Sequence, residues 1–208
     1  MTTQTLPASR RWFSKSWLLE QKSLIALMVL IAVVASQSPN FFTVANLFNI
    51  LQQTSVNAIM AVGMTLVILT GGIDLSVGAV AGICGMVAGA LLTNGIPLWG
   101  GNTLFLNVPE VILVVALFGI LAGLINGTVI TRLGVAPFIC TLGMMYVARG
   151  AALLFNDGGT YANLVGLPAL GNTGFAVLGS GTLLGVYLPI WLMLGFLLLG
   201  LYLTRKTP

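Results

Sequence analysis

The sequence predicts an all-α protein, a polytopic transmembrane helical bundle with about six spans and both ends in the cytoplasm. Of its 208 residues, 58% are hydrophobic and only 6% are charged, whereas soluble domains carry about 25% charged residues. The mean hydropathy is +1.06. Apolar runs close to the ~20 residues that cross a bilayer as a helix recur along the chain. Because so few charges cannot cover a soluble surface, we predict a membrane protein embedded in the lipid bilayer.

The composition also argues against several kinds of chemistry. The chain has no histidine, which is the commonest general base and metal ligand. Cys84 and Cys140 lie inside apolar runs, so we expect small core residues rather than a disulfide or a metal site. No Gly-x-x-x-x-Gly-Lys-Ser/Thr loop occurs, so the chain is not expected to bind ATP in a P-loop. We therefore predict no catalytic residues, no metal and no cofactor.

The chain is predicted to divide into a basic tail over 1–22 and a transmembrane domain over 23–208. The tail contains Ser9–Lys15, which fits a twin-arginine export signal. A cleaved signal is usually followed by a soluble protein, and several further apolar runs follow here. A cytoplasmic tail is therefore the preferred interpretation. The predicted spans are 18–36, 46–69, 75–92, 110–131, 136–155 and 187–204.

The span boundaries rest on polar residues and helix breakers. Pro39-Asn40 separates the first two spans, and Asn94–Pro97 ends the third. Arg132 closes the fourth span, and Arg149 lies near the far end of the fifth. The loops are predicted over 94–109 and 156–186, and the second has room for a re-entrant helix.

The basic residues set the predicted orientation. With the N-terminus in the cytoplasm, seven of the eight Lys and Arg residues lie on the cytoplasmic side, and only Arg149 lies outside. This distribution follows the positive-inside rule, so the net charge of +4 indicates membrane orientation and no nucleic-acid partner. The seven are Arg10, Arg11, Lys15, Lys22, Arg132, Arg205 and Lys206.

A short polar stretch with one carboxylate separates the second and third predicted spans. Asp74 follows a Gly pair and precedes Ser76. One interpretation is that Asp74 caps the helix that follows, since a carboxylate stabilises a helix N-terminus. The other is that it lines an inner gate or couples to a cytoplasmic partner, because carboxylates in membrane segments are usually functional. The gate or coupling candidates are Asp74, Thr70, Gly72 and Ser76.

Neutral hydrogen-bonding side chains also lie within the spans. They suit a neutral, hydroxyl-rich solute better than an ion, although hydrogen bonds between helices would also account for them. The candidates for a translocation pathway are Gln53, Asn57, Thr65 and Asn126. On the fourth span a stripe of small residues predicts close helix packing, with a dimer interface or a moving seam as the alternative. The stripe consists of Gly119, Gly123 and Gly127.

Several segments resemble one family of transporters. They are Ser38–Thr43, Asn46–Gln53, Ala61–Thr65, Gly72–Gly78, Arg132–Ile139 and Thr141–Gly143. These residues are similar to bacterial monosaccharide ABC importer permeases, and up to about Gly78 especially to those that import ribose. Gly72–Gly78 is the most specific of these segments, and the likeness is looser beyond it.

The resemblance implies a homodimeric permease in the bacterial inner membrane. It would receive ribose or a similar sugar from a periplasmic sugar-binding protein, and a separate cytoplasmic ABC ATPase subunit would drive transport. Members of this family continue past the position that matches Pro208, so the chain is expected to be a fragment or the product of a truncated gene.

Two rival functions differ from this one in class. A proton-coupled secondary carrier for a neutral polar solute would be expected to have a titratable residue in the middle of a span, and Asp74 lies at a span boundary. A membrane enzyme could use Asp74 and Asp157 as an acid/base pair, but the predicted topology places them on opposite faces of the bilayer.

Overall fold

The computed structural model describes residues 21–161 and 164–206. Most of the predicted basic tail, its twin-arginine-like run and the backward extension of the first span to residue 18 lie outside these residues. By its internal contacts the chain divides into two compact units, Met1–Asn49 and Ile50–Pro208.

The first unit holds α2 (Lys22–Gln37) and the start of α3 (Val44–Leu69). The turn between them lies at the predicted Pro39-Asn40 position. Asn46 Nδ2 donates to the Phe41 carbonyl at 2.8 Å, and Thr43 Oγ1 accepts from the Asn46 N–H at 3.2 Å. The second bond satisfies a backbone N–H in the first turn of α3, where the N–H groups have no partners within the helix.

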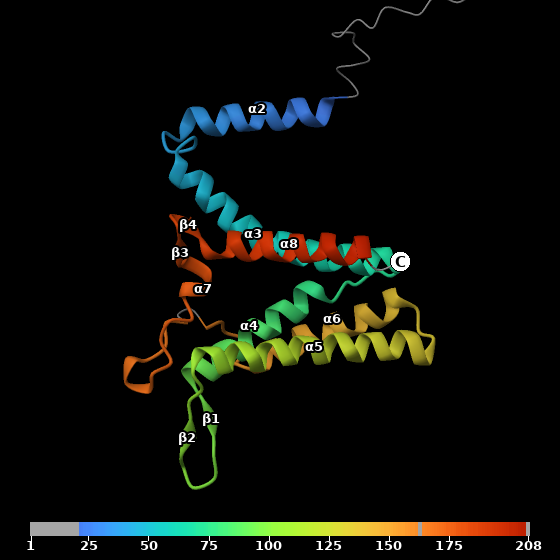
Figure 1. The fold of residues 1–208 in the computed structure, drawn as a ribbon, viewed down its shortest axis with the longest axis vertical. Coiled ribbons are helices and arrows are strands. Elements are labelled where there is room, and N and C mark those ends of the chain that lie inside the picture. The colour runs from blue at the N-terminus through green and yellow to red at the C-terminus, as the bar shows by residue number, and fades with distance from the viewer. Residues whose placement is uncertain (1–20, 162–163, 207–208) are drawn as a thin grey trace, which may run out of the picture. The chain divides into compact units, whose positions relative to one another are not determined.

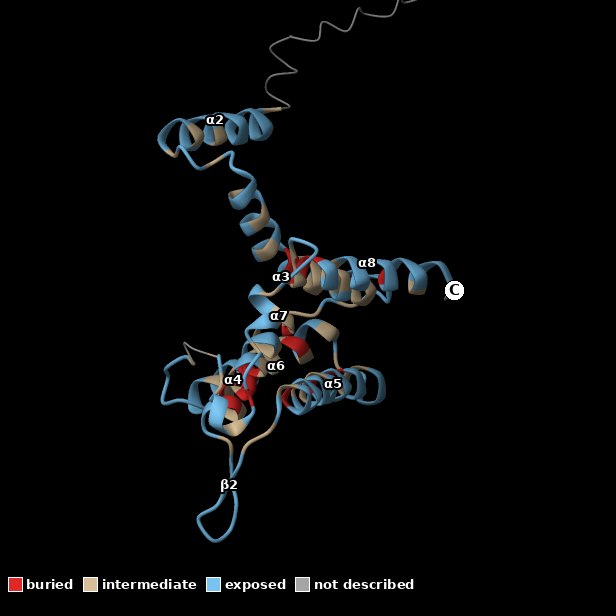
Figure 2. Ribbon diagram, turned by 60° about the vertical axis from the view of Figure 1, so that its left-hand side comes forward, coloured by how far each residue is buried: buried red, intermediate tan, exposed pale blue. Residues whose placement is uncertain are grey.

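The second unit contains a group of three packed helices (Figure 1). These are α4 (Val77–Thr93), α5 (Val108–Leu133) and α6 (Pro137–Leu154). Within this group α4 is the most buried helix (Figure 2). Its buried side includes Ala88 and Gly89, and such small residues let neighbouring helices approach closely.

The ends of α5 and α6 follow recognisable sequence signals. The Glu110 carboxylate accepts a hydrogen bond from the Asn107 N–H at 2.8 Å, which forms half of a capping box before α5. Gly134 ends α5 in a left-handed conformation with φ 66°. Pro137 then occupies the first turn of α6, where its missing N–H costs no helical hydrogen bond.

The loop after α6 is joined to α4 by two side chains. Asn172 is fully buried, donates to the Leu92 carbonyl at 3.0 Å and accepts from the Leu167 N–H at 2.7 Å. The Tyr161 ring lies directly against Gly89. The loop therefore satisfies a carbonyl at the C-terminal end of α4, which would otherwise lack a helical partner.

The remaining elements are short, apart from one long helix. A hairpin of β1 (Ile96–Pro97) and β2 (Thr103–Leu104) follows α4. A 3-10 turn η1 (Pro168–Leu170) and the single-turn α7 (Val177–Ser180) lie in the predicted loop 156–186. A second hairpin, β3 (Thr182–Leu183) and β4 (Val186–Tyr187), leads into α8 (Leu188–Lys206). The structure places α8 beside the second-unit part of α3, where a Cβ at Gly200 would meet Val62 Cγ1 at 2.7 Å.

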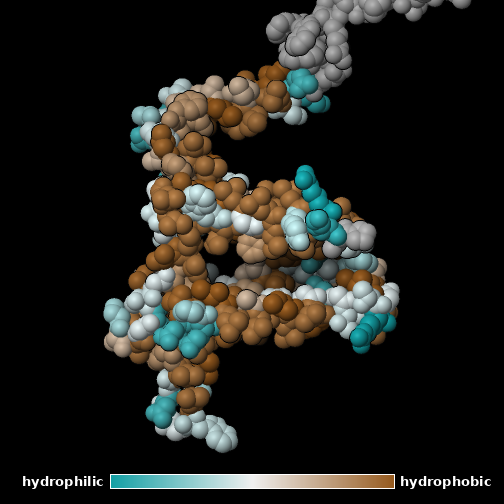
Figure 3. Space-filling view, viewed as in Figure 1, coloured by the Kyte–Doolittle hydropathy of each residue, from teal (hydrophilic) through white to brown (hydrophobic). Residues whose placement is uncertain are grey.

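The predicted all-α membrane class is confirmed. Of the described helices, four are long and apolar enough to cross a membrane, namely α3, α5, α6 and α8, while α2 and α4 are shorter, with 16 and 17 residues. Apolar side chains cover most of the visible helix surface (Figure 3). On α5, Leu113, Ile120 and Leu124 are 58–61% exposed, as expected for side chains that face lipid. The division into six spans stays a prediction.

Candidate functional site

The predicted gate segment forms a non-helical link between α3 and α4. The Gly72 N–H donates to the Val67 carbonyl at 3.1 Å, which closes the end of α3. Gly71 has φ +80°, a conformation that strains other residues. The link therefore requires glycine at position 71.

Asp74 and Ser76 hold the second half of the link in place. One carboxylate oxygen, Asp74 Oδ1, accepts from the Ser76 N–H at 2.7 Å and from the Ser76 hydroxyl at 2.6 Å. Ser76 is 1% exposed and is the N-cap residue of α4. The interpretation that Asp74 itself caps α4 is therefore wrong, because Asp74 orders the turn two residues before the cap. Hydrogen bonds to a carboxylate are stronger than neutral ones.

Side chains from α5 and α6 meet this turn. Asn126 of α5 is 5% exposed, and its Nδ2 donates to Ser76 Oγ at 3.0 Å. Cys140 Sγ of α6 lies 3.7 Å from Asn126 Oδ1. Thr141 Oγ1, also of α6, lies 3.2 Å from the Ile73 carbonyl. A continuous polar chain thus runs from Asn126 through Ser76 to Asp74 and joins the start of α4 to both neighbouring helices.

A pocket of about 280 Å³ lies beside this chain, and we call it the Asp74 pocket. Its lining consists of Met60, Asp74, Ser76, Val77, Val80, Ala81, Cys84, Gly119, Gly123 and Asn126. Asp74 is the one carboxylate in this lining. Among the described residues no group of three or more His, Cys, Asp or Glu side chains could hold a metal. The arrangement offers hydrogen bonds and one negative charge, and it contains no second carboxylate for acid/base catalysis.

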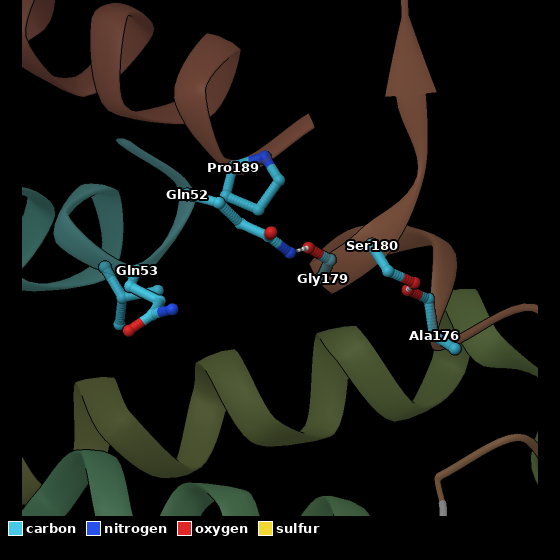
Figure 4. A pocket seen from close by; sticks show the side chains of 7 residues that line it. Gln52, Gln53, Ala176, Gly179, Ser180 and Pro189 are labelled. Carbon is cyan, nitrogen blue, oxygen red and sulfur yellow. Dashed lines mark hydrogen bonds between the residues drawn. The ribbon is translucent and has the colours of Figure 1, made fainter. Parts of the chain in front are cut away.

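A second and larger pocket, of about 510 Å³, lies between α3 and the segment that contains α7 (Figure 4). We call it the amide pocket, and it is lined by Gln52, Gln53, Val56, Ala176, Gly179, Ser180 and Pro189. Gln52 Nε2 donates to the Gly179 carbonyl at 2.6 Å across the pocket. The Ser180 hydroxyl of α7 donates to the carbonyl of Ala176, the N-cap residue of that helix, at 2.9 Å.

The structure brings together some of the predicted site residues. Asp74, Ser76 and Asn126 meet at the Asp74 pocket, where Gly119 and Gly123 form part of the wall. The other predicted residues do not line the Asp74 pocket. These are Gln53 in the amide pocket, Thr65 bonded to Ala61, Thr70 bonded to Val67, Gly72 against Val67, Asn57 exposed on α3 and Gly127 exposed on α5.

The sequence predicted no site role for three residues that lie in or beside these sites. Cys140, expected as a small core residue, lies against Asn126, and Thr141 contacts the Ile73 carbonyl in the turn that Asp74 orders. Gln52 was a polar residue without an assigned role. The one signal in the sequence for its place in the amide pocket is that it directly precedes Gln53.

A family model described as "Branched-chain amino acid transport system / permease component" matches residues 46–164. That range contains every residue that lines the Asp74 pocket. The chain belongs to this permease family.

The permease is similar to curated sugar importers. It is 46% identical over 200 residues to the ribose import permease protein RbsC of Escherichia coli K12, with 93% of this chain and 56% of that protein covered. RbsC of Bacillus subtilis is 36% identical over 185 residues, with coverage of 88% and 52%. The galactose/methyl galactoside import permease protein MglC of Escherichia coli K12 is 38% identical over 164 residues, with coverage of 75% and 48%.

The chain thus spans about half the length of the curated relatives it matches. No solved structure matches the permease.

Proposed function

We propose that the permease is the membrane subunit of a binding-protein-dependent ABC importer that moves a monosaccharide, ribose or a similar sugar, across the inner membrane. The observation that carries this proposal is the 46% identity to a ribose import permease over 93% of the chain. Of the other named relatives, RbsC of Bacillus subtilis is also a ribose import permease, whereas MglC is a galactose/methyl galactoside import permease. The sugar class therefore rests on all three named relatives, and the choice of ribose rests on the two RbsC proteins.

In this proposal the chain performs no covalent chemistry. A separate cytoplasmic ATPase subunit hydrolyses ATP, and a periplasmic sugar-binding protein delivers the solute. A second copy of the permease completes the pathway as a homodimer. The N-terminus lies in the cytoplasm, as the distribution of Lys and Arg predicts.

The Asp74 segment supplies a mechanism for coupling. Its hydrogen bonds fasten the start of α4 to α5 and α6, so these three helices are built to move as one body. Gly71, with φ +80°, and Gly72 connect that body to α3. A push from the ATPase at the cytoplasmic end would tilt the three helices about this connection. Asp74, Thr70, Gly72 and Ser76 are therefore proposed as gate or coupling residues.

The proposed pathway residues are Gln53, Asn57, Thr65 and Asn126. Exposed amides in a membrane helix are costly unless they face protein or a water-filled cavity. Gln53 lines the amide pocket and Asn57 lies one helical turn further along α3. Gly119, Gly123 and Gly127 are proposed as packing positions that let α5 approach a neighbouring helix closely.

Reconstituted transport tests this function. The full-length permease, its ATPase and the binding protein are placed in proteoliposomes, and uptake of labelled D-ribose is measured with ATP or with an imposed proton gradient. We expect uptake that requires both ATP and the binding protein. Uptake driven by the proton gradient without ATP would overturn the proposal in favour of a secondary carrier.

A further inference from the structure

From the amide pocket we infer a binding site for one neutral, hydroxyl-rich solute molecule, in which the Gln53 side chain contacts the solute. This inference rests on the proposed sugar-transport function and adds to it a specific site and a specific contact residue.

The size and lining of the pocket fit such a solute. Its volume of about 510 Å³ lies in the ~300–1,000 Å³ range of small-molecule sites. No Asp, Glu, Lys or Arg is among the lining residues, so the pocket provides no charged partner for an ion. Val56 and Pro189 provide apolar surface for the C–H groups of a sugar ring, beside the polar groups that fix its orientation.

The two glutamines of the pocket differ in their hydrogen bonding (Figure 4). Gln52 Nε2 is engaged with the Gly179 carbonyl at 2.6 Å, and this bond connects α3 to the opposite wall of the pocket. Gln53 is exposed, and its side chain makes no hydrogen bond to the described residues. A primary amide has two N–H donors and one carbonyl acceptor, and a sugar hydroxyl both donates and accepts. Gln53 can therefore bind adjacent hydroxyls without breaking a contact within the protein.

The position of Gln53 in a membrane helix supports the same conclusion. It lies in α3, which is apolar enough to cross a bilayer. An amide that faces lipid loses its hydration without gaining a hydrogen bond, which is unfavourable in free energy. In a hydrated pocket, water supplies the hydrogen bonds that the amide needs, and a bound polar solute replaces that water.

A binding measurement on the permease alone tests the inference. The full-length permease is purified in nanodiscs without ATPase or binding protein, and binding of labelled D-ribose and D-galactose is measured by scintillation proximity. For Gln53→Leu we expect a rise in Kd of about tenfold or more, because a sugar hydroxyl loses its partner. The matched control is Gln37→Leu, an exposed glutamine of α2 outside the pocket, with an unchanged Kd. If Gln53→Leu does not fold, as judged by gel filtration, Gln53→Asn is used in its place and should also weaken binding.

The possible results separate this inference from the function on which it rests. If sugar binds to wild type and to Gln53→Leu with the same Kd, the amide pocket is not the site, whereas the transport function stands. If wild type binds L-leucine instead of either sugar, or binds neither sugar, the inference is wrong. In both cases the uptake assay decides the proposed function independently.

Discussion

The hydroxyl of Ser76 makes the sharpest prediction for stability. It donates to Asp74 Oδ1 at 2.6 Å and accepts from Asn126 Nδ2 at 3.0 Å, and the residue is 1% exposed. A hydrogen bond to a charged group contributes about 1.5–3 kcal/mol, and a hydrogen bond between membrane helices averages about 0.6 kcal/mol. Ser76→Ala removes both, so it should lower the free energy of unfolding by about 2–3.5 kcal/mol.

Reversible unfolding in mixed micelles with increasing SDS measures this change. Ser36→Ala is the matched control, because the Ser36 hydroxyl is exposed and bonds only within its own helix, to Val33. Its effect should stay within about 0.5 kcal/mol. Combining Ser76→Ala with Asn126→Leu should cost less than the sum of the two single variants, because they share a bond. A Ser76→Ala protein as stable as Ser36→Ala would refute the argument that this polar chain fastens α4 to its neighbours.

Three further predictions test other features of the structure. Gly89→Ala should destabilise the permease by about 1–3 kcal/mol in the same unfolding assay, because a Cβ would overlap the Tyr161 ring. Gly85→Ala is the control on the same helix, because a Cβ there has open space and should not destabilise the protein. Equal losses of stability in the two variants would contradict this packing. Glu110→Ala should cost about 0.5–2 kcal/mol, because it removes the capping contact that begins α5; unchanged stability would show that this cap is dispensable. Asp74→Asn should leave the protein largely folded but slow sugar uptake per folded molecule, and normal uptake with only a lower yield would remove the proposed gate role.

Much of the helical framework could be predicted from the sequence, because membrane helices are long apolar runs. The described helices occupy the predicted ranges, and their ends differ by a few residues. Some of these helix ends have capping signals in the sequence. Asn107 and Glu110 have the spacing of a capping box, which places the start of α5 two residues before the predicted boundary. The short elements between 94 and 109 and between 156 and 186 were missed, because two-residue strands and single helical turns leave no periodic pattern.

The candidate sites were predictable only in part, because their residues come from different helices. Ser76 and Asn126 are separated by 50 positions and Ile73 and Thr141 by 68, and a single sequence gives no indication that they touch. The sequence identified Asp74 as an unusual carboxylate between apolar runs, but which residue caps α4 depends on the path of the backbone through the glycine pair. Gln52 and Gln53 are adjacent in sequence and look alike. Only the Gly179 carbonyl distinguishes them.

The most direct test of the account is sugar uptake by the reconstituted importer when one component at a time is omitted. Proteoliposomes contain the full-length permease, the ATPase and the sugar-binding protein, and D-ribose uptake and ATP hydrolysis are followed together. The proposed importer mechanism predicts that uptake is lost when any one of the three is left out, and that a protonophore has no effect. Sustained uptake by the permease without the ATPase would contradict it.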